Sequence, residues 1–476
     1  MILAVLFLYF CVLAFVSKRA GGNDSDADFF LGNRRSPWWA VAIGMVGASV
    51  SGVSFVSVPG WVTSTSFSYM QMVLGFLVGY LVVACVMLPY YYKSGTLSIY
   101  ALLSSRLGEI GRKTGACFFL INKLLGAAVK FYVAAYVFFR LSGMEFLPFP
   151  LFVVACVAFV YLYTYRGGIR SIVWTDLLQT CLMILSLLLL LNAALSALNM
   201  DWRAGLRFVA ESDMSRIFYF DDWSGRNYFW KHFISGAFVV IVMTGLDQDM
   251  IQKNLSCRSL REARRNMLSY GLLFIPVNLL FLTLGLLVAS YYGPETLPAK
   301  GDELLPYFVN EAGSLVLVCF SVGMLASSFS SVDSSMTAMT TSILSDLMAK
   351  DGKEVSATYR HKIHLGVALA VGLTVLALGF VKSGHAIDVI YQLVSYLYGP
   401  LLGMFSYCYF HRKGGFNSKW IAVVAILSPI ISFIVSKKIR TALGYEMGYE
   451  LLLLNGMVTY IGVSFIRVFI SDGKRI

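Results

Sequence analysis

The segment "LLQTCLMILSLLLLLNAALSAL" at residues 177–198 decides the fold class, because it is long, apolar and free of charged side chains. About 20 such residues in a helix cross the hydrocarbon core of a bilayer, which is about 30 Å thick. The whole chain agrees with this segment: 58% of its 476 residues are hydrophobic, 13% are charged, and the mean hydropathy is +0.72. Soluble domains carry about a quarter charged residues. We therefore predict an all-α polytopic membrane protein, since a β-barrel would show short alternating segments instead.

Apolar runs recur along the whole chain. They predict about thirteen transmembrane helices, at residues 1–17, 37–60, 66–92, 115–140, 147–164, 171–199, 228–251, 266–292, 313–347, 363–383, 386–411, 420–436 and 449–466. The segment 313–347 is too long for one crossing, so we expect it to bend or to extend beyond the membrane. The longest outside insert, 200–227, is rich in aromatic residues and is expected to form an interfacial lid or a short helix.

The distribution of basic residues sets the predicted orientation. With the N-terminus outside, the cytoplasmic segments hold 25 of the 38 Lys and Arg residues, as the positive-inside rule requires. This accounts for the net charge of +12 without a nucleic-acid partner. We expect a multi-pass protein of the cell membrane (inner or plasma) whose C-terminus is cytoplasmic. Segment 1–17 has no positive charge before its apolar run, which favours a retained helix, although a cleaved signal peptide stays an alternative.

The segment "SSFSSVDSS" at residues 327–335 is unusually polar for a membrane helix. At 100° per residue, one helical face carries Ser327, Ser330, Ser331 and Ser334, with Ser328 adjacent. These serines could serve close helix packing or bond to their own backbone. Alternatively, their hydroxyls and freed carbonyls could supply the several oxygen ligands that a hard monovalent cation requires.

Asp176 enters a long apolar segment near its cytoplasmic end. At 1.5 Å per residue it lies roughly 9 Å into its span, and the serines lie roughly 21 to 27 Å from the outer surface. In a core of about 30 Å, the carboxylate and the serines therefore reach a similar depth. A bound cation would relieve the cost of burying the carboxylate, whereas capping of the helix at the interface is the alternative.

Two segments have weak helix centres. In residues 38–61, glycines and serines interrupt the apolar pattern, which favours a discontinuous helix, with close helix packing as the alternative. In residues 233–266, small residues at 235–236 and 244–245 mark a candidate second broken helix. Its basic end, with Asp247, is expected to anchor the cytoplasmic side.

Two lysines lie inside the predicted span 115–140. Lys123 is close enough to the cytoplasm to extend its ammonium toward water. Lys130 lies near the middle of the bilayer, where it either pairs with a carboxylate of the protein or receives an anionic substrate.

Four segments together resemble the sodium:solute symporter family. They are "LGNRRSPWWAVAIGMVGASVSGVSFVSVPG" (31–60), "GGIRSIVWTDLLQ" (167–179), "GLDQDMIQKNLSCRSLREAR" (245–264) and "ASSFSSVDSSMTAMTTSILSDL" (326–347), in the order of the family. The resemblance implies one transporter domain over 1–476 with a LeuT-like core, a five-plus-five inverted repeat of discontinuous helices. The implied parts are an extra N-terminal helix (1–17), repeats at 37–199 and 228–411, and two C-terminal helices (420–466).

The resemblance also implies two sodium sites. The first would use backbone carbonyls of Gly47, Val50 and Met324 with the hydroxyls of Ser327 and Ser328. The second would use Asp176 with the hydroxyls of Ser327, Ser330 and Ser331. Sodium would be the coupling ion, and no other cofactor is implied. Asp333 lies outside both sets and is expected to be structural.

The substrate site implied by the resemblance is less complete. The positions at which sugar carriers of the family place a polar contact and a gating aromatic ring are Val239 and Val242, which argues against a standard hexose mode. The candidate substrate-binding residues are Ser49, Ser51, Ser54, Gln71 and Lys130. Lys130 could take the cationic role of an arginine in the sialic-acid branch, so an organic anion such as a sialic acid is favoured.

The resulting hypothesis is a sodium-coupled symporter that imports a small organic solute, with two sodium ions, the lipid bilayer as its surroundings and no obligate protein partner. The alternatives are symport of a neutral sugar or amino acid, and a proton-coupled carrier using Asp176. A sensor or a channel is less favoured. An enzyme is not expected, because the motifs contain no Ser/His/Asp arrangement, metal-ligand spacing or phosphate-binding loop.

Overall fold

The structure is a computed structural model, and it describes residues 2–21, 25–141, 143, 148–165, 167–225, 227–293, 295–298, 300–348, 356–379, 386–411, 415–445 and 447–473. Within these ranges every regular element is a helix. The longer helices are α1 (Ile2–Ala20), α3 (Trp38–Ser49), α4 (Gly52–Thr65), α5 (Tyr69–Val82), α7 (Ala101–Leu141), α8 (Phe149–Thr164), α9 (Gly168–Ala197), α11 (Phe229–Val240), α13 (Leu260–Tyr292), α15 (Ser314–Ser342), α16 (Ala357–Leu378), α17 (Ala386–Phe410), α18 (Trp420–Leu443) and α19 (Leu451–Gly473). Short helices are α2 (Asp26–Leu31), α6 (Leu88–Ser94), α10 (Trp202–Glu211), α12 (Gln248–Leu255) and α14 (Leu304–Glu311).

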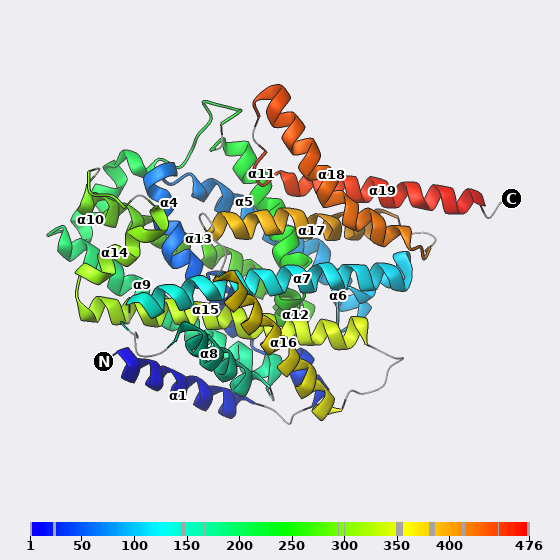
Figure 1. The fold of residues 1–476 in the computed structure, drawn as a ribbon, viewed down its shortest axis with the longest axis horizontal. Coiled ribbons are helices and arrows are strands. Elements are labelled where there is room, and N and C mark those ends of the chain that lie inside the picture. The colour runs from blue at the N-terminus through cyan, green and yellow to red at the C-terminus, as the bar shows by residue number, and fades with distance from the viewer. Residues whose placement is uncertain are drawn as a thin grey trace.

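Many of the long helices run along the long axis of the molecule (Figure 1). The N- and C-terminal ends of the chain lie at opposite ends of this axis, and the short helices α10 and α14 lie toward the N-terminal end. The helix α10 falls within the insert 200–227 and confirms the short helix expected there.

The predicted spans coincide with helices. Among the described residues, eight helices are long and apolar enough to cross a membrane, or ten if each of two bent pairs is one span. The other three expected spans fall on α1, on the 16-residue α8 and on α17. The protein is therefore a multi-pass helical membrane protein, and the total of thirteen spans stays a prediction. The span expected at 115–140 is part of a longer helix, α7, with a kink at Gly108.

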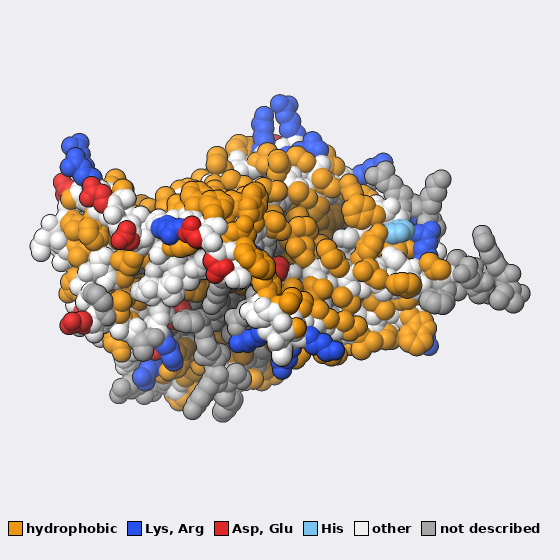
Figure 2. Space-filling model, turned by 90° about the horizontal axis from the view of Figure 1, so that it is seen from above, with side chains coloured by type: hydrophobic (Ala, Val, Ile, Leu, Met, Phe, Trp, Pro, Cys, Tyr) orange, Lys and Arg blue, Asp and Glu red, His pale blue; other side chains and the backbone are white. Residues whose placement is uncertain are grey.

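The outer surface of the helices is apolar. Leu373 on α16, Leu272 on α13 and Ile426 on α18 expose 68%, 66% and 59% of their surface. Figure 2 shows hydrophobic side chains spread over the centre and right of one face, with few charged side chains among them. Lipid tails are as apolar as these side chains, so this surface is suited to a bilayer rather than to water.

The first break predicted from the sequence lies between α3 and α4, which meet at an angle of 64°. Val50 and Ser51 between them are extended, so their backbone groups leave the helical pattern. Glycine permits the close packing around this break. A Cβ at Gly47 would overlap Thr180 Oγ1 on α9, and a Cβ at Gly52 would overlap Ser328 Oγ on α15.

The second break lies between residues 229–245, which form α11 and a π-helical turn, and α12, at an angle of 65°. It follows Gly245, at the small residues expected to interrupt this span. Asp247 caps α12, because its carboxylate accepts a hydrogen bond from the N–H of Asp249 at 2.9 Å. Each bent pair lies at the start of one of the two predicted repeats, 37–199 and 228–411. Discontinuous helices at corresponding positions are typical of transporters built from two repeats.

The helix α15 lies at the centre of the protein and packs against α9, α7, α3 and α4. Every residue from Gly323 to Ser342 is buried. The helix continues as a π-helical turn to Leu347, and this run has no break of the kind seen in the two bent pairs. The structure therefore shows a continuous helix over this segment rather than a break, and its extension beyond the membrane stays a prediction.

Candidate functional site: two oxygen clusters beside a cavity

The serines of α15 meet the break between α3 and α4. Ser331 Oγ donates a hydrogen bond to the carbonyl of Ala48 at 2.8 Å, and Ser328 Oγ lies against Gly52. Ser327 and Ser328 donate to the carbonyl of Met324 at 3.0 and 2.8 Å. Each hydroxyl that donates one proton keeps two lone pairs, so these bonds leave acceptors for a cation. The serine face thus adjoins the segment that carries Gly47 and Val50, the other members of the predicted first sodium site.

Asp176 on α9 lies beside the same serines. Its Oδ1 accepts a hydrogen bond from Ser330 Oγ at 2.5 Å, and its Oδ2 lies 3.4 Å from Ser334 Oγ. Asp176 is 1% exposed, so its carboxylate does not cap the helix at the water interface. The interpretation of Asp176 as an interfacial cap is therefore wrong. Ser334, which belongs to neither predicted sodium site, is also a neighbour of this carboxylate.

A lysine outside the predicted sites reaches the same carboxylate. Lys253 Nζ on α12 lies 2.8 Å from Asp176 Oδ2 and 3.6 Å from Asp249 Oδ1, and all three side chains are at most 2% exposed. Asp249 also pairs with Lys123, at 2.8 Å. The only sequence signal for this cluster was the density of charges in "DQDMIQK" directly after the second break.

Lys123 does not extend toward the cytoplasm as expected. Its ammonium lies 3.0 Å from both carboxylate oxygens of Asp247 and is largely buried. Asp247 also accepts a short hydrogen bond from Tyr398 OH. Asp247 therefore has the structural role predicted for it, but at the helix break beside the cavity rather than at the end of the span.

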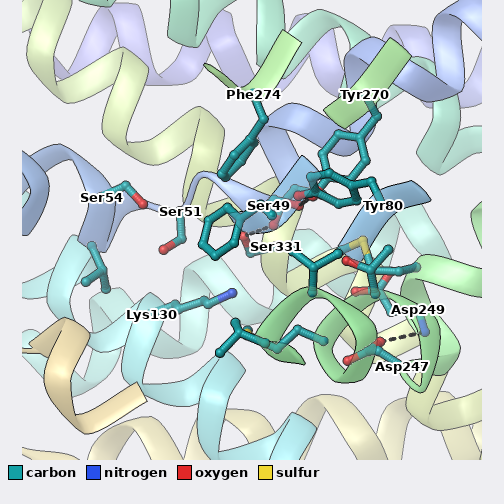
Figure 3. Close-up of a pocket in the computed structure, with 18 of the residues that line it drawn as sticks. Ser49, Ser51, Ser54, Tyr80, Lys130, Asp247, Asp249, Tyr270, Phe274 and Ser331 are labelled. Carbon is teal, nitrogen blue, oxygen red and sulfur yellow. Dashed lines mark hydrogen bonds between the residues drawn. The ribbon is translucent and has the colours of Figure 1, made fainter. Parts of the chain in front are cut away.

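A cavity lies between the serine face, α4, α5, α7, the α11–α12 pair and α13. The space within it that the centres of water molecules can reach is about 110 Å³. Its lining includes the predicted substrate residues Ser49, Ser51, Ser54 and Lys130, together with Ser331 from the predicted second sodium site. Figure 3 shows Lys130, Ser51 and Ser54 on one side of the cavity and Tyr80 and Tyr270 on the other. The cavity and the candidate cation ligands are thus contiguous.

Lys130 points into this cavity from α7 (Figure 3). Lys123 and Lys253, by contrast, each lie within 4 Å of carboxylates, and within the described part of the chain Lys130 has no such ion pair. Of the two interpretations of Lys130, pairing with a protein carboxylate is not supported by the described residues. An anionic group of a substrate could take that place.

The opposite side of the cavity is lined by phenol groups. Ser49 Oγ lies 2.5 Å from Tyr270 OH, and Tyr80 OH donates to the same oxygen at 3.0 Å. Phe76 and Phe274 add apolar surface beside them. Tyr80 and Tyr270 lie outside the family motifs, so no sequence pattern predicted them.

Gln71, the fifth predicted substrate residue, does not line the cavity. Its amide donates to the carbonyl of Asn227 at 2.8 Å and accepts from the N–H of Tyr219 at 3.1 Å. Gln71 thus connects the segment between α10 and α11 to α5.

Asp333 has the structural contacts expected of it. Its carboxylate accepts hydrogen bonds from Tyr163 OH at 2.7 Å and from the N–H of Ser334 at 2.5 Å. Among the described residues no group of three or more His, Cys, Asp or Glu side chains could hold a metal ion. The candidate cation ligands are therefore neutral oxygens with one carboxylate, which suits a hard monovalent ion better than a transition metal.

This chain is similar to known transporters. The family described as the sodium:solute symporter family matches residues 29–421. The sodium/sialic acid symporter NanT of Aliivibrio fischeri is 23% identical over 441 residues, which cover 85% of this chain and 81% of that protein. The human sodium-coupled monocarboxylate transporter 2 is 25% identical over 467 residues, covering 89% of this chain and 73% of that protein.

The fold is similar to a solved structure of a sodium-coupled sialic acid symporter in a substrate-bound, outward-open state. The TM-score is 0.79 at 20% sequence identity, over 97% of this chain and 96% of that chain. At this identity the similarity establishes the fold alone. It confirms the predicted LeuT-like, all-α transporter fold.

Proposed function

Because the chain belongs to the sodium:solute symporter family, we propose that it is a secondary active symporter that imports a small organic anion together with sodium. The observation that carries the coupling to sodium is the meeting of the α15 serines with the break between α3 and α4. Hydroxyls and unwound carbonyls at one place are the ligands that transporters of discontinuous helices use for sodium.

The first sodium ion is assigned to the carbonyls of Gly47, Val50 and Met324 and the hydroxyls of Ser327 and Ser328. The second is assigned to Asp176 and the hydroxyls of Ser327, Ser330 and Ser331. Ser327 belongs to both sets, and Ser331 reaches Ala48 beside the first site. When one ion binds and orders these shared groups, binding of the other ion becomes more favourable.

The proposed substrate is an organic anion, such as a sialic acid or another carboxylate. Lys130, in the cavity without a carboxylate partner among the described residues, supports this class. Ser51 and Ser54 line the same side of the cavity and are the proposed contacts for its polar groups. NanT is a sialic acid symporter and the human relative is a monocarboxylate transporter, and both names agree with an anionic substrate.

We also propose that the N-terminus lies outside the cell membrane and the C-terminus in the cytoplasm. The positions of the two ends along the long axis and the distribution of basic residues support this orientation (Figure 1). The inverted repeats are placed at 37–199 and 228–411, each beginning with a bent helix pair.

Uptake into proteoliposomes tests this proposal. Sialic acid, monocarboxylates, neutral sugars and amino acids are first ranked by the thermal stabilisation that each gives with sodium chloride and with choline chloride. We expect an anion to stabilise the protein in sodium only, and its radiolabelled uptake to depend on sodium with a Hill coefficient above one. Asp176→Ala should reduce this coefficient toward one.

Three results would contradict the proposal. Uptake driven by a proton gradient in the absence of sodium would identify a proton-coupled carrier. Stabilisation by a neutral sugar or amino acid, and not by anions, would refute the substrate class. A sodium current without any substrate would identify a channel.

A further inference from the structure

The carboxylate proposed for the second sodium ion already has a positive partner within the chain. Lys253 Nζ lies 2.8 Å from Asp176 Oδ2, and both side chains are 1% exposed. A buried carboxylate requires one positive counter-charge, which either a sodium ion or an ammonium supplies. In this structure, therefore, Lys253 neutralises the group on which the second sodium ion depends.

Lys253 has an alternative partner nearby. Asp249 Oδ1 lies 3.6 Å from the same ammonium, one turn earlier on α12. Among the described residues, Lys253 Nζ and Asp249 Oδ1 both lack an aligned hydrogen bond. The ammonium thus lies between two carboxylates and is nearer to Asp176.

The position of Lys253 on a bent element makes its distance from Asp176 depend on the angle of the break. It lies on α12, directly after the 65° break, whereas Asp176 lies on α9. The pair therefore joins the second predicted repeat to the first. A change in the angle of the break would alter the distance between Lys253 and Asp176 but not the spacing of Lys253 and Asp249 within α12.

We propose that the Lys253 ammonium is a tethered competitor of the second sodium ion: it occupies Asp176 when sodium is absent and moves to Asp249 when sodium binds. This inference rests on the proposed sodium coupling and adds a residue that sets the affinity of the second site. The sodium ion and the Lys253 ammonium replace each other at the Asp176 carboxylate, so its negative charge is balanced in both states.

Sodium binding without substrate tests this inference. The melting temperature of the full-length protein in detergent is titrated with sodium chloride, with choline chloride holding the ionic strength constant. In Lys253→Met, the sodium concentration of half-maximal stabilisation should fall by roughly tenfold or more, because the competitor no longer occupies most of the sites. Lys253→Arg keeps the positive charge and should retain the wild-type concentration.

Two further variants give opposite expectations. Asp249→Asn removes the alternative partner, holds Lys253 on Asp176 and should raise the half-maximal sodium concentration. Asp176→Asn combined with Lys253→Met removes both charges and should abolish the gain of Lys253→Met. Equal half-maximal concentrations in the wild type and Lys253→Met would overturn the inference.

Folding of Lys253→Met is informative by itself. Recovery of this variant in sodium but not in choline is an expected result, because sodium replaces the missing ammonium. Its loss in both salts overturns the inference, because sodium then does not replace the missing ammonium. A wild-type protein with no sodium-specific stabilisation would instead refute the proposed sodium coupling, so the two failures are distinguishable.

Discussion

At the scale of single residues, the chemistry of the site depends on which buried charges have partners. Lys123 and Lys253 are held by carboxylates, whereas Lys130 points into the cavity without one among the described residues. These three lysines thus have different roles. The first two complete a charge network at the helix break, and the third is available to a ligand.

Lys130→Gln should weaken the transport of an anionic substrate. A hydrogen bond to a charged group contributes about 1.5–3 kcal/mol, so the KM should rise by roughly 10- to 100-fold. Lys130→Arg keeps the charge and should lose much less. The measurement is sodium-driven uptake of the anion selected by thermal stabilisation. An unchanged KM in Lys130→Gln would remove Lys130 from the substrate site.

At the scale of helices, the two breaks decide which groups meet. The break between α3 and α4 was predicted from the sequence because glycines and small polar residues mark it locally. Its close packing against α15 depends on the absence of a side chain at Gly52. That makes the packing testable by adding one methyl group.

Gly52→Ala should disturb the first sodium site. The added Cβ would overlap Ser328 Oγ and come within 2.7 Å of Ala134 Cβ, and overpacking of this kind costs about 1–3 kcal/mol. We expect a lower melting temperature and weaker stabilisation by sodium. Gly126→Ala on α7 is the matched control, since no atom lies within 4 Å of its added Cβ. Sodium stabilisation equal to that of Gly126→Ala would contradict the proposed ligand arrangement.

Gln71→Leu should loosen the segment between α10 and α11 without altering substrate affinity. The variant loses the bonds to Asn227 and Tyr219, which connect this segment to α5. Hydrogen exchange of peptides covering 216–228 should become faster, while the KM for the substrate stays near the wild-type value. A large rise in KM would restore Gln71 as the substrate contact suggested by the resemblance.

At the scale of the whole molecule, the fold and the meeting of the serine face with the first break were more predictable than the charge network. Hydropathy and family motifs identified the spans, the breaks and the serine face, because each has a local pattern. The predicted span 228–251 ended before Lys253, which placed this lysine in a cytoplasmic loop. The 65° bend and the packing of α12 instead bury it against Asp176. Such a contact depends on the angle between two helices, which no local pattern specifies.

The number of sodium ions also sets the charge that the whole transporter moves. Two sodium ions with a monovalent anion carry one net positive charge inward, whereas one sodium ion with that anion carries none. A charge crossing 100 mV gains about 2.3 kcal/mol, so an inside-negative potential should raise the accumulation of the anion by roughly 50-fold. The measurement is equilibrium accumulation in proteoliposomes clamped with potassium and valinomycin. Asp176→Asn should abolish the dependence on potential while sodium dependence remains, because the first site is intact. Accumulation that is insensitive to potential in the unmodified protein would establish one sodium ion per anion and exclude the second site.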